Sequence, residues 1–205
     1  GLGPASQPYT GWGTSWFDYD NDGWLDTFTA NGTIITLEGH QNAFPYDQHR
    51  LLFRNLGNGR FENVTAKAGS TFAISESGRG AAFGDVDNDG DIDILVGNDA
   101  GPARLLRNDI GNRQHWVGLR AIGASAARDM LGARIGVTGA DGRTLWRRVR
   151  ADGSYASAND PRVLVGLGAA TGPVRVEVKW PDGRSETWSA VPADRWTTLR
   201  QGDAK

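Results

Sequence analysis

Two short acidic segments of the chain carry the same arrangement of carboxylates. Each spans nine residues, with Asp at positions 1, 3, 5 and 9, Asn at position 4 and Gly at position 6. The carboxylates are Asp18, Asp20, Asp22 and Asp26 in the first copy and Asp85, Asp87, Asp89 and Asp93 in the second. Two like charges 4 Å apart cost roughly 4 kcal/mol at an effective dielectric of about 20. Such a cluster is tolerated where a cation lies among the side chains.

Carboxylate oxygens are hard ligands that suit Ca²⁺, which takes about 6–8 oxygens at roughly 2.3–2.6 Å. We therefore predict two Ca²⁺ sites, one in each segment, held by these side chains, by the backbone carbonyl at position 7 and by water. Position 7 is Trp24 in the first copy and Asp91 in the second. The Gly at position 6 permits the sharp reversal that points the oxygens inward. The alternative is a pair of solvated Asp-Asn-Gly turns without metal, and the repeated spacing argues against it.

The residues around the acidic segments favour strands over helices. An EF-hand needs Glu at position 12 and flanking helices, but position 12 is Thr29 in one copy and Val96 in the other. The flanks are short runs of β-branched, aromatic and small residues, which are typical of strands. These runs are residues 13–17, 27–30, 80–84 and 94–97. Each copy is therefore predicted to be a β-hairpin with a calcium loop at its tip.

The two hairpins resemble the FG-GAP (VCBS-type) repeats of integrin-like β-propellers. The matching residues run from Trp16 to Asp26 and from Ala82 to Asp93, within a resemblance over roughly residues 10–110. The resemblance implies that each repeat forms much of one four-stranded blade and that its loop binds calcium. Residues 50–65 fit as strand, Gly-Asn-Gly turn and strand, and residues 105–109 repeat the start of that motif.

The second half of the chain has a different composition, which changes near residues 109–113. Seven segments with strand character predict a small sandwich: 116–122, 133–138, 144–150, 163–167, 174–180, 187–190 and 196–200. In residues 174–180 apolar and charged side chains alternate strictly. We therefore expect an all-β chain, with two β-propeller-type blades carrying calcium loops over residues 1–112 and a small β-sandwich over residues 113–205.

This second half resembles the ASPIC/UnbV domain, which follows FG-GAP repeats in bacterial proteins and in cartilage acidic protein. The residues that carry the resemblance are 153–168, with support from 132–137 and 180–183. The resemblance implies a fold and a context more than a chemistry. The polar stretch Ser154, Tyr155, Ser157, Asn159, Asp160 and Arg162 could form a ligand-contacting loop, or a turn that caps its own backbone.

Blade number and bulk composition indicate what the chain binds. Propellers close with about 4–8 blades, so two blades leave strand edges that another copy, another extracellular protein or the sandwich would cover. The net charge of −2 does not favour binding to nucleic acid or to an anionic membrane, and no apolar run is long enough to span a bilayer.

The absence of cysteine bears on the expected location. Without disulfides, bound metal is the cross-link available to stabilise the fold. We therefore expect an extracellular or cell-surface location, with the periplasm also open, and read the start at Gly1 as a processed product.

The expected function is non-enzymatic adhesion or assembly. No catalytic residue and no organic cofactor is expected, because the sequence has no nucleophile elbow, phosphate loop or dinucleotide fingerprint. The main alternative is a carbohydrate-binding module that uses the Asn-Asp-Pro loop and exposed Trp. The candidate tryptophans are Trp12, Trp16 and Trp24, or Trp146 and Trp188. Residues 36–49 contain Glu38, His40, Asp47 and His49, whose spacing matches no compact zinc pattern and favours a surface loop.

Overall fold

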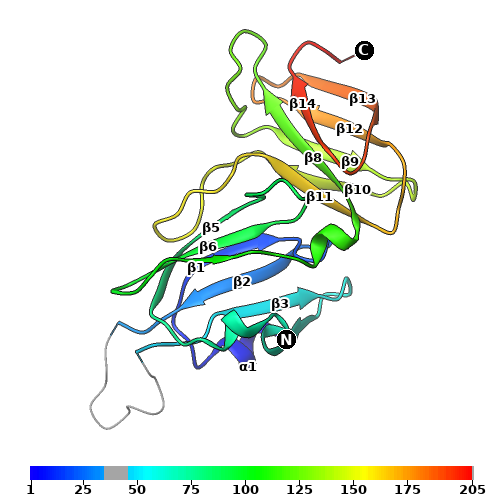
Figure 1. Cartoon of the computed structure of the whole chain (residues 1–205). Coiled ribbons are helices and arrows are strands. Elements are labelled where there is room, and N and C mark those ends of the chain that lie inside the picture. The colour runs from blue at the N-terminus through cyan, green and yellow to red at the C-terminus, as the bar shows by residue number, and fades with distance from the viewer. Residues whose placement is uncertain (35–45, 205) are drawn as a thin grey trace.

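The computed structural model describes residues 1–34 and 46–204, and its regular structure is almost entirely β (Figure 1). In these residues fourteen strands form four sheets. The chain completes two sheets before it begins the other two. Figure 1 shows the first pair in the lower half of the molecule and the second pair in the upper half.

The first sheet is an antiparallel meander. Its strands are β1 (Gly11–Phe17), β2 (Asp26–Asn31), β3 (Leu51–Asn55) and β4 (Phe61–Asn63), in the spatial order β1-β2-β3-β4. A short helix, α1 (Leu2–Ser6), lies beside β4. The first acidic segment is the turn between β1 and β2, as the sequence predicts.

The second sheet repeats this plan with three strands. They are β5 (Gly78–Gly84), β6 (Asp93–Asn98) and β7 (Arg104–Leu106), in the order β5-β6-β7. Two 3-10 helices, η1 (Thr65–Lys67) and η2 (Ser70–Ala73), connect β4 to β5. The second acidic segment is the turn between β5 and β6. Both acidic segments therefore occupy the same place in their sheets.

The first two sheets share one apolar core. Phe17 and Phe28 from the first sheet are buried against Phe83, Ile94 and Val96 from the second. The ring centroids of Phe17 and Phe83 are 5.2 Å apart, and those of Phe28 and Phe83 are 5.9 Å apart. The first pair is tilted and the second is edge-to-face, and aromatic pairs of this kind add to the free energy of burial. Strand β1 buries alternate residues, whereas β2 is buried at five of its six positions.

The last seven strands form a sandwich. They are β8 (His115–Ile122), β9 (Arg134–Thr138), β10 (Thr144–Arg148), β11 (Val163–Gly168), β12 (Val174–Lys179), β13 (Ser185–Val191) and β14 (Trp196–Arg200), preceded by the 3-10 helix η3 (Gly111–Arg113). One sheet has the order β10-β9-β12-β13 and the other β11-β8-β14. Side chains from both sheets meet in a single core, including Leu119, Ile135, Val176 and Leu199.

All seven strands predicted for the second half are present, with boundaries shifted by a few residues. One pairing follows no signal in the sequence: β14 runs parallel to β8, with Trp196 opposite Gly118. Parallel neighbours need a long connection, and strands β9 to β13 supply it. The helix α1 also lies where the sequence indicated none.

A loop of the second half covers the outer edge of β5. The N–H of Ala81 donates to Ser157 Oγ at 2.8 Å, and the N–H of Phe83 donates to Asn159 Oδ1 at 3.0 Å. The N–H of Asp160 donates to the carbonyl of Phe83 at 3.0 Å. These bonds replace those of a neighbouring strand. In the described residues the two sheets do not close into a propeller, and the polar stretch around the Asn-Asp-Pro motif serves as an intrachain edge cover.

Candidate metal centres

Three carboxylates converge in the first acidic loop. Asp18, Asp20 and Asp22 each present an oxygen, and these atoms lie within 4.8 Å of one another. Asn21 has φ 55° and Gly23 has φ 90°, both in the left-handed region. Gly enters that region without steric cost and Asn tolerates it. These two residues reverse the chain so that alternate carboxylates face one interior.

The second loop has the same conformation. Asp85, Asp87 and Asp89 present oxygens within 4.8 Å of one another, and Asn88 and Gly90 have φ 61° and 96°. Within residues 1–34 and 46–204, these two Asp triads are the groups of three or more side chains that could hold a metal ion. The repeat in sequence is thus a repeat in geometry.

The first carboxylate of each loop organises the turn. Asp18 accepts the N–H groups of Asp22 at 3.1 Å and Gly23 at 2.9 Å. Asp85 accepts the N–H groups of Asp89 at 3.1 Å and Gly90 at 3.0 Å. Removing either side chain would leave these donors unpaired, so position 1 supports the loop as well as facing its interior.

The carboxylate at position 9 fastens the loop to the strands around it. Asp26 accepts the N–H groups of Tyr19 at 3.0 Å and Asn55 at 2.7 Å. Asp93 makes the equivalent pair of bonds in the second repeat, to the N–H groups of residues 86 and 108. Both lie outside the grouped triads, although a carboxylate oxygen that accepts one hydrogen bond keeps a second lone pair. Their role as metal ligands stays a prediction.

The two side chains at position 7 pack in different ways. Trp24 lies over Gly57, where an added Cβ would come within 2.8 Å of the indole ring. Asp91 is fully buried and accepts the N–H of Asn112 at 3.1 Å. Burial raises the pKa of Asp91 to about 8. The sequence assigns their backbone carbonyls to the metal, and that assignment also stays a prediction.

The first loop holds carboxylates that are costly to ionise without a cation. Burial raises the pKa of Asp18 to about 7 and that of Asp26 to about 8, partly opposed by the backbone N–H bonds that each accepts. Burial, and then repulsion by Asp22, raises the pKa of Asp20. A cation among these groups reverses the balance by stabilising the charged forms.

An arginine already supplies positive charge at each triad. Arg54 Nε lies 2.7 Å from Asp20 Oδ2, and its Nη2 lies 3.2 Å from Asp22 Oδ2. Arg107 has the equivalent place in the second repeat, with Nη1 3.9 Å from Asp87 Oδ2. Asp20 Oδ1 is buried and has no hydrogen-bond partner among the described residues. An oxygen-only donor set with an orphaned buried oxygen fits a hard cation such as Ca²⁺.

The first loop also packs against the second loop and against β11. Asn21 Nδ2 donates to the carbonyls of Gly90 and Gly111 at 2.8 and 2.9 Å, so the two acidic loops contact each other. The Asn21 carbonyl accepts the N–H of Gly168 at 2.8 Å. A Cβ added at Gly166 would lie 2.4 Å from the Asn21 backbone. Glycines of β11 therefore permit backbone contact between loop and sandwich.

Two tryptophans and an arginine of the second half hold the second loop. Trp196 Nε1 donates to Asp85 Oδ2 at 3.1 Å, and the Trp116 ring lies over Gly90. Arg162 donates to the Asp85 carbonyl at 2.8 Å and to Asn88 Oδ1 at 2.7 Å, with its guanidinium over Trp196. Sequence reasoning missed these contacts. Trp and Arg in a β-sandwich indicate packing or surface, and nothing in their spacing points to contacts with a loop up to 111 residues away.

Other side chains considered in the sequence do not gather into a site. His49 Nδ1 lies 3.3 Å from Ser75 Oγ, and residue 47 forms an isolated bridge with residue 32. Glu38 and His40 lie outside the described residues. Trp12 donates to the Gly32 carbonyl at 2.7 Å and packs against other side chains. In the described part of the chain, no helix has the length and apolar character to cross a membrane.

Comparison with known proteins matches two families to the two halves. The model of the FG-GAP-like repeat matches residues 43–96, which include the second acidic loop, and the model named ASPIC and UnbV matches residues 123–205. The chain is similar to cartilage acidic protein 1 of Mus musculus, 46% identical over 55 residues, and of Xenopus tropicalis, 41% identical over 56 residues. Each alignment covers 27% of this chain and 8% of the relative.

These matches agree with the resemblances carried by the second acidic loop and by residues 153–168. They also agree with the order of the two halves, repeat first and sandwich second. The chain carries an FG-GAP-like repeat followed by an ASPIC and UnbV domain.

Proposed function

We propose that this chain is a non-enzymatic, calcium-stabilised part of an extracellular adhesion or assembly protein, with one Ca²⁺ in each acidic loop. The observation that carries the proposal is the duplicated Asp triad on two hairpins of the same conformation. The match to an FG-GAP-like repeat across the second loop supports it. The carboxylates accept backbone N–H groups, and within each triad their oxygens lie close together. This arrangement suits the binding of a structural ion better than acid–base catalysis.

The structural role of the ion follows from where the loops lie. Each loop contacts the other and the sandwich through backbone carbonyls and carboxylates. We call the region where the two loops meet the sandwich the junction. Repulsion between the unshielded carboxylates opposes packing there, and a bound cation removes that repulsion. Calcium is thus expected to fix the loops and, through them, the surface that the molecule presents.

The test is calorimetric titration of the chelator-treated protein with CaCl₂. Two equivalents of Ca²⁺ are expected, with Asp18→Asn and Asp85→Asn each abolishing one. At one hundred times Kd each ion adds about 2.7 kcal/mol to the free energy of unfolding. Absence of calcium uptake at millimolar concentration would falsify the calcium proposal.

An apolar outer face supports association. Leu95 of β6 and Leu105 of β7 are cross-strand neighbours and are 48% and 52% exposed. They point away from the core shared by the first two sheets, where a propeller would place the next blade. We propose that another copy covers this face. Stable association needs at least about 1,000 Å² of buried surface.

Mass in solution decides this part of the proposal. Light scattering at micromolar concentration is expected to give a mass above that of one chain, which Leu105→Lys and chelation both reduce. Val86→Lys, a change at an exposed position in the acidic loop, is the matched control. A monomer at all concentrations, with calcium bound, would rule out self-association and leave another extracellular protein as the partner.

The absence of cysteine supports the location. A chain with no disulfide gains stability from metal, and millimolar extracellular calcium saturates sites that cytosolic levels leave empty. Detection of the protein at the cell surface or in the medium, by labelling with a membrane-impermeant reagent, would support this. Recovery only from the cytosol would contradict it.

One observation favours carbohydrate binding as a second candidate. Trp16 is 51% exposed and its ring centroid lies 5.7 Å from that of Phe61, which makes an accessible aromatic surface. Such surfaces bind sugar faces. Trp24 lies over Gly57 and under the Arg143 guanidinium, so it adds little to a platform. Glycan-array binding that Trp16→Ala abolishes and chelation does not would establish this alternative.

A further inference from the structure

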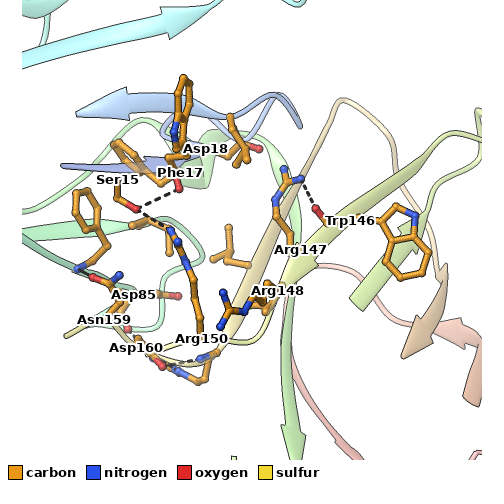
Figure 2. A pocket seen from close by; sticks show the side chains of 18 residues that line it. Ser15, Phe17, Asp18, Asp85, Trp146, Arg147, Arg148, Arg150, Asn159 and Asp160 are labelled. Atoms are coloured by element: carbon orange, nitrogen blue, oxygen red, sulfur yellow. Dashed lines mark hydrogen bonds and ion pairs between the residues drawn. The ribbon is translucent and has the colours of Figure 1, made fainter. Parts of the chain in front are cut away.

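A cavity of about 340 Å³ lies between the two halves of the molecule (Figure 2). Strands β1 and β5 line one side, and β10 with the segments on either side of residue 160 line the other. This volume is in the range of small-molecule sites, which are commonly found between domains. No sequence pattern predicts the cavity, because its walls come from segments up to 149 residues apart.

The charges that line the cavity favour an anion. Its walls include four arginines and three aspartates. Arg162 is paired with Asp160 at 2.6 Å. The other two aspartates are Asp18 and Asp85, the first carboxylates of the acidic loops, which already accept backbone N–H bonds. Arg148 is paired with Asp152 at 3.7 Å. The two remaining guanidiniums, Arg147 and Arg150, balance the two loop carboxylates, so a cation in each loop would give the cavity a positive excess.

Two of the arginines have donors to spare. Arg147 donates to the carbonyls of Trp146 and Gly23, and Arg150 donates to Ser15 Oγ at 3.2 Å. Among the described residues neither has a carboxylate within ion-pairing distance. Figure 2 shows both side chains reaching from the sandwich toward the first half. A guanidinium has five N–H donors in a planar fork that matches a carboxylate. Arg147 and Arg150 can therefore each donate to a further acceptor.

The remaining wall is apolar. Phe17, Phe83 and Ile92 contribute from the first half, and Val163 and Leu164 from the second. Water gains little on such a surface, whereas the body of an organic molecule would bury apolar area there. An inorganic anion would pair with the arginines but would leave this apolar wall exposed to water.

We propose that the cavity between the halves binds an organic carboxylate with an apolar or aromatic body, held at its charged end by Arg147 and Arg150. This site goes beyond the proposed calcium-dependent assembly. Its ligand is defined by a carboxylate next to an apolar body, which a free metabolite and the C-terminus of a peptide can both supply. Because Asp18 and Asp85 face the same cavity, binding is strongest when calcium occupies the loops.

The probes are 2-naphthoate and its uncharged amide, 2-naphthamide, which have the same shape. Titrations are run by calorimetry on the full chain in excess CaCl₂. We expect 2-naphthoate to bind at least about tenfold more tightly than 2-naphthamide, as for a hydrogen bond to a charged group. Inorganic phosphate should bind more weakly than 2-naphthoate, because it leaves the apolar wall uncovered. A short peptide ending in Phe, with a free or an amidated C-terminus, tells a peptide source from a free carboxylate.

Variants of Arg150 test the site with little risk to the fold. Arg150→Gln should weaken 2-naphthoate at least about tenfold and leave 2-naphthamide unchanged, while Arg150→Lys keeps part of the affinity. The control is Arg175→Gln, which removes an exposed guanidinium from β12. Circular dichroism and melting temperature check that each variant is folded.

The proposal is overturned if 2-naphthoate gives no binding at 1 mM, if the amide binds equally well, or if Arg150→Gln and Arg175→Gln behave alike. A calcium titration on the same sample reports separately on the metal sites. Failure of calcium binding with intact 2-naphthoate binding would reject the proposed calcium role and keep the carboxylate site.

Discussion

Single aspartates in the loops differ in what they already bind. Asp18 and Asp85 accept two backbone N–H groups each, so their loss removes loop structure together with any metal ligand. Asp87 is 37% exposed, and the nearest cationic group is Arg107 at 3.9 Å. A change at Asp87 therefore separates metal binding from folding of the loop better than a change at position 1.

Asp87→Ala is expected to reduce the calcium-dependent stability. If affinity at the second loop falls a hundredfold, about 2 kcal/mol of the free energy of unfolding is lost at a calcium concentration one hundred times the original Kd. Urea denaturation with and without chelator measures this. In chelator the variant and the parent should be nearly equal. The control is Asp203→Ala, which removes the same charge near the C-terminus; an equal effect of both variants would contradict the assignment.

Glu76 is expected to control the acid stability of the first half. It binds Arg104 at 2.7 Å and also Arg50, which is 3% exposed, so it joins the second sheet to the segment before β3. Glu76→Gln leaves the buried Arg50 charge without its carboxylate and should cost about 2 kcal/mol at pH 7. The bonds from Arg104 and Arg50 lower the Glu76 pKa below its usual 4.5.

The stabilisation from a lowered pKa is fully present above the unfolded value and is lost as the pH falls through the folded value. The difference between parent and Glu76→Gln should therefore shrink below pH about 4.5. Denaturation curves at pH 7 and pH 3.5 measure it. Glu62→Gln, at an exposed pair with Lys67, is the control and should have no resolvable effect. A difference that is constant with pH would contradict this role.

At the scale of elements, the first acidic loop and β11 meet backbone to backbone. Gly166 pairs with Trp116 in the sheet, and its missing side chain leaves room for the backbone of Asn21. Loop and strand thus determine each other's position. The apolar, β-branched run in β11 predicts the strand, while the fit of the glycine to a distant loop explains the choice of residue.

Gly166→Ala should destabilise the protein by about 2 kcal/mol, the usual range for overpacking, because its Cβ would lie 2.4 Å from Asn21 backbone atoms that cannot rotate away. Gly97→Ala on β6 is the matched control, since an added Cβ there meets nothing within 4 Å. Urea denaturation compares the two. Equal stability of both variants would show that the loop does not dock on β11.

At the scale of the whole molecule, the junction connects the two apolar cores. The first core lies between the first two sheets, the second lies inside the sandwich, and the acidic loops with their arginine and tryptophan contacts lie between them. A loop confined to a hairpin tip would affect one half when its cation leaves. A loop in the junction should affect both halves.

Chelation is therefore expected to increase amide exchange in both halves. Hydrogen exchange measured by mass spectrometry should show faster exchange in β1 and β5 and also in β8 and β11, because opening of the junction exposes all four. Strand β13, at the far edge of its sheet, serves as the internal reference. Changes confined to residues 10–110 would contradict the coupling.

The sequence by itself determined the local features of this protein. Asp at positions 1, 3, 5 and 9 with Gly at position 6 predicts a tight acidic turn, and Gly23 and Gly90 adopt the left-handed conformation that this turn requires. Short runs of β-branched and aromatic residues predict the strands, and in residues 174–180 the alternation of apolar and charged side chains adds the period of two that a strand requires. Both signals act over a few residues, so they survive without knowledge of the fold.

Only the tertiary structure decided what surrounds the loops. Contacts of Asn21 with β11, of Trp196 with Asp85 and of Arg150 with Ser15 join residues far apart in the chain. The first is made by backbone groups, and the other two use side chains that could equally well pack elsewhere. Hydrogen bonds and close packing depend on separation in space, and sequence spacing does not encode that separation across two domains. The cavity with its arginines could not be predicted from the sequence for the same reason, because it forms only when the two halves dock.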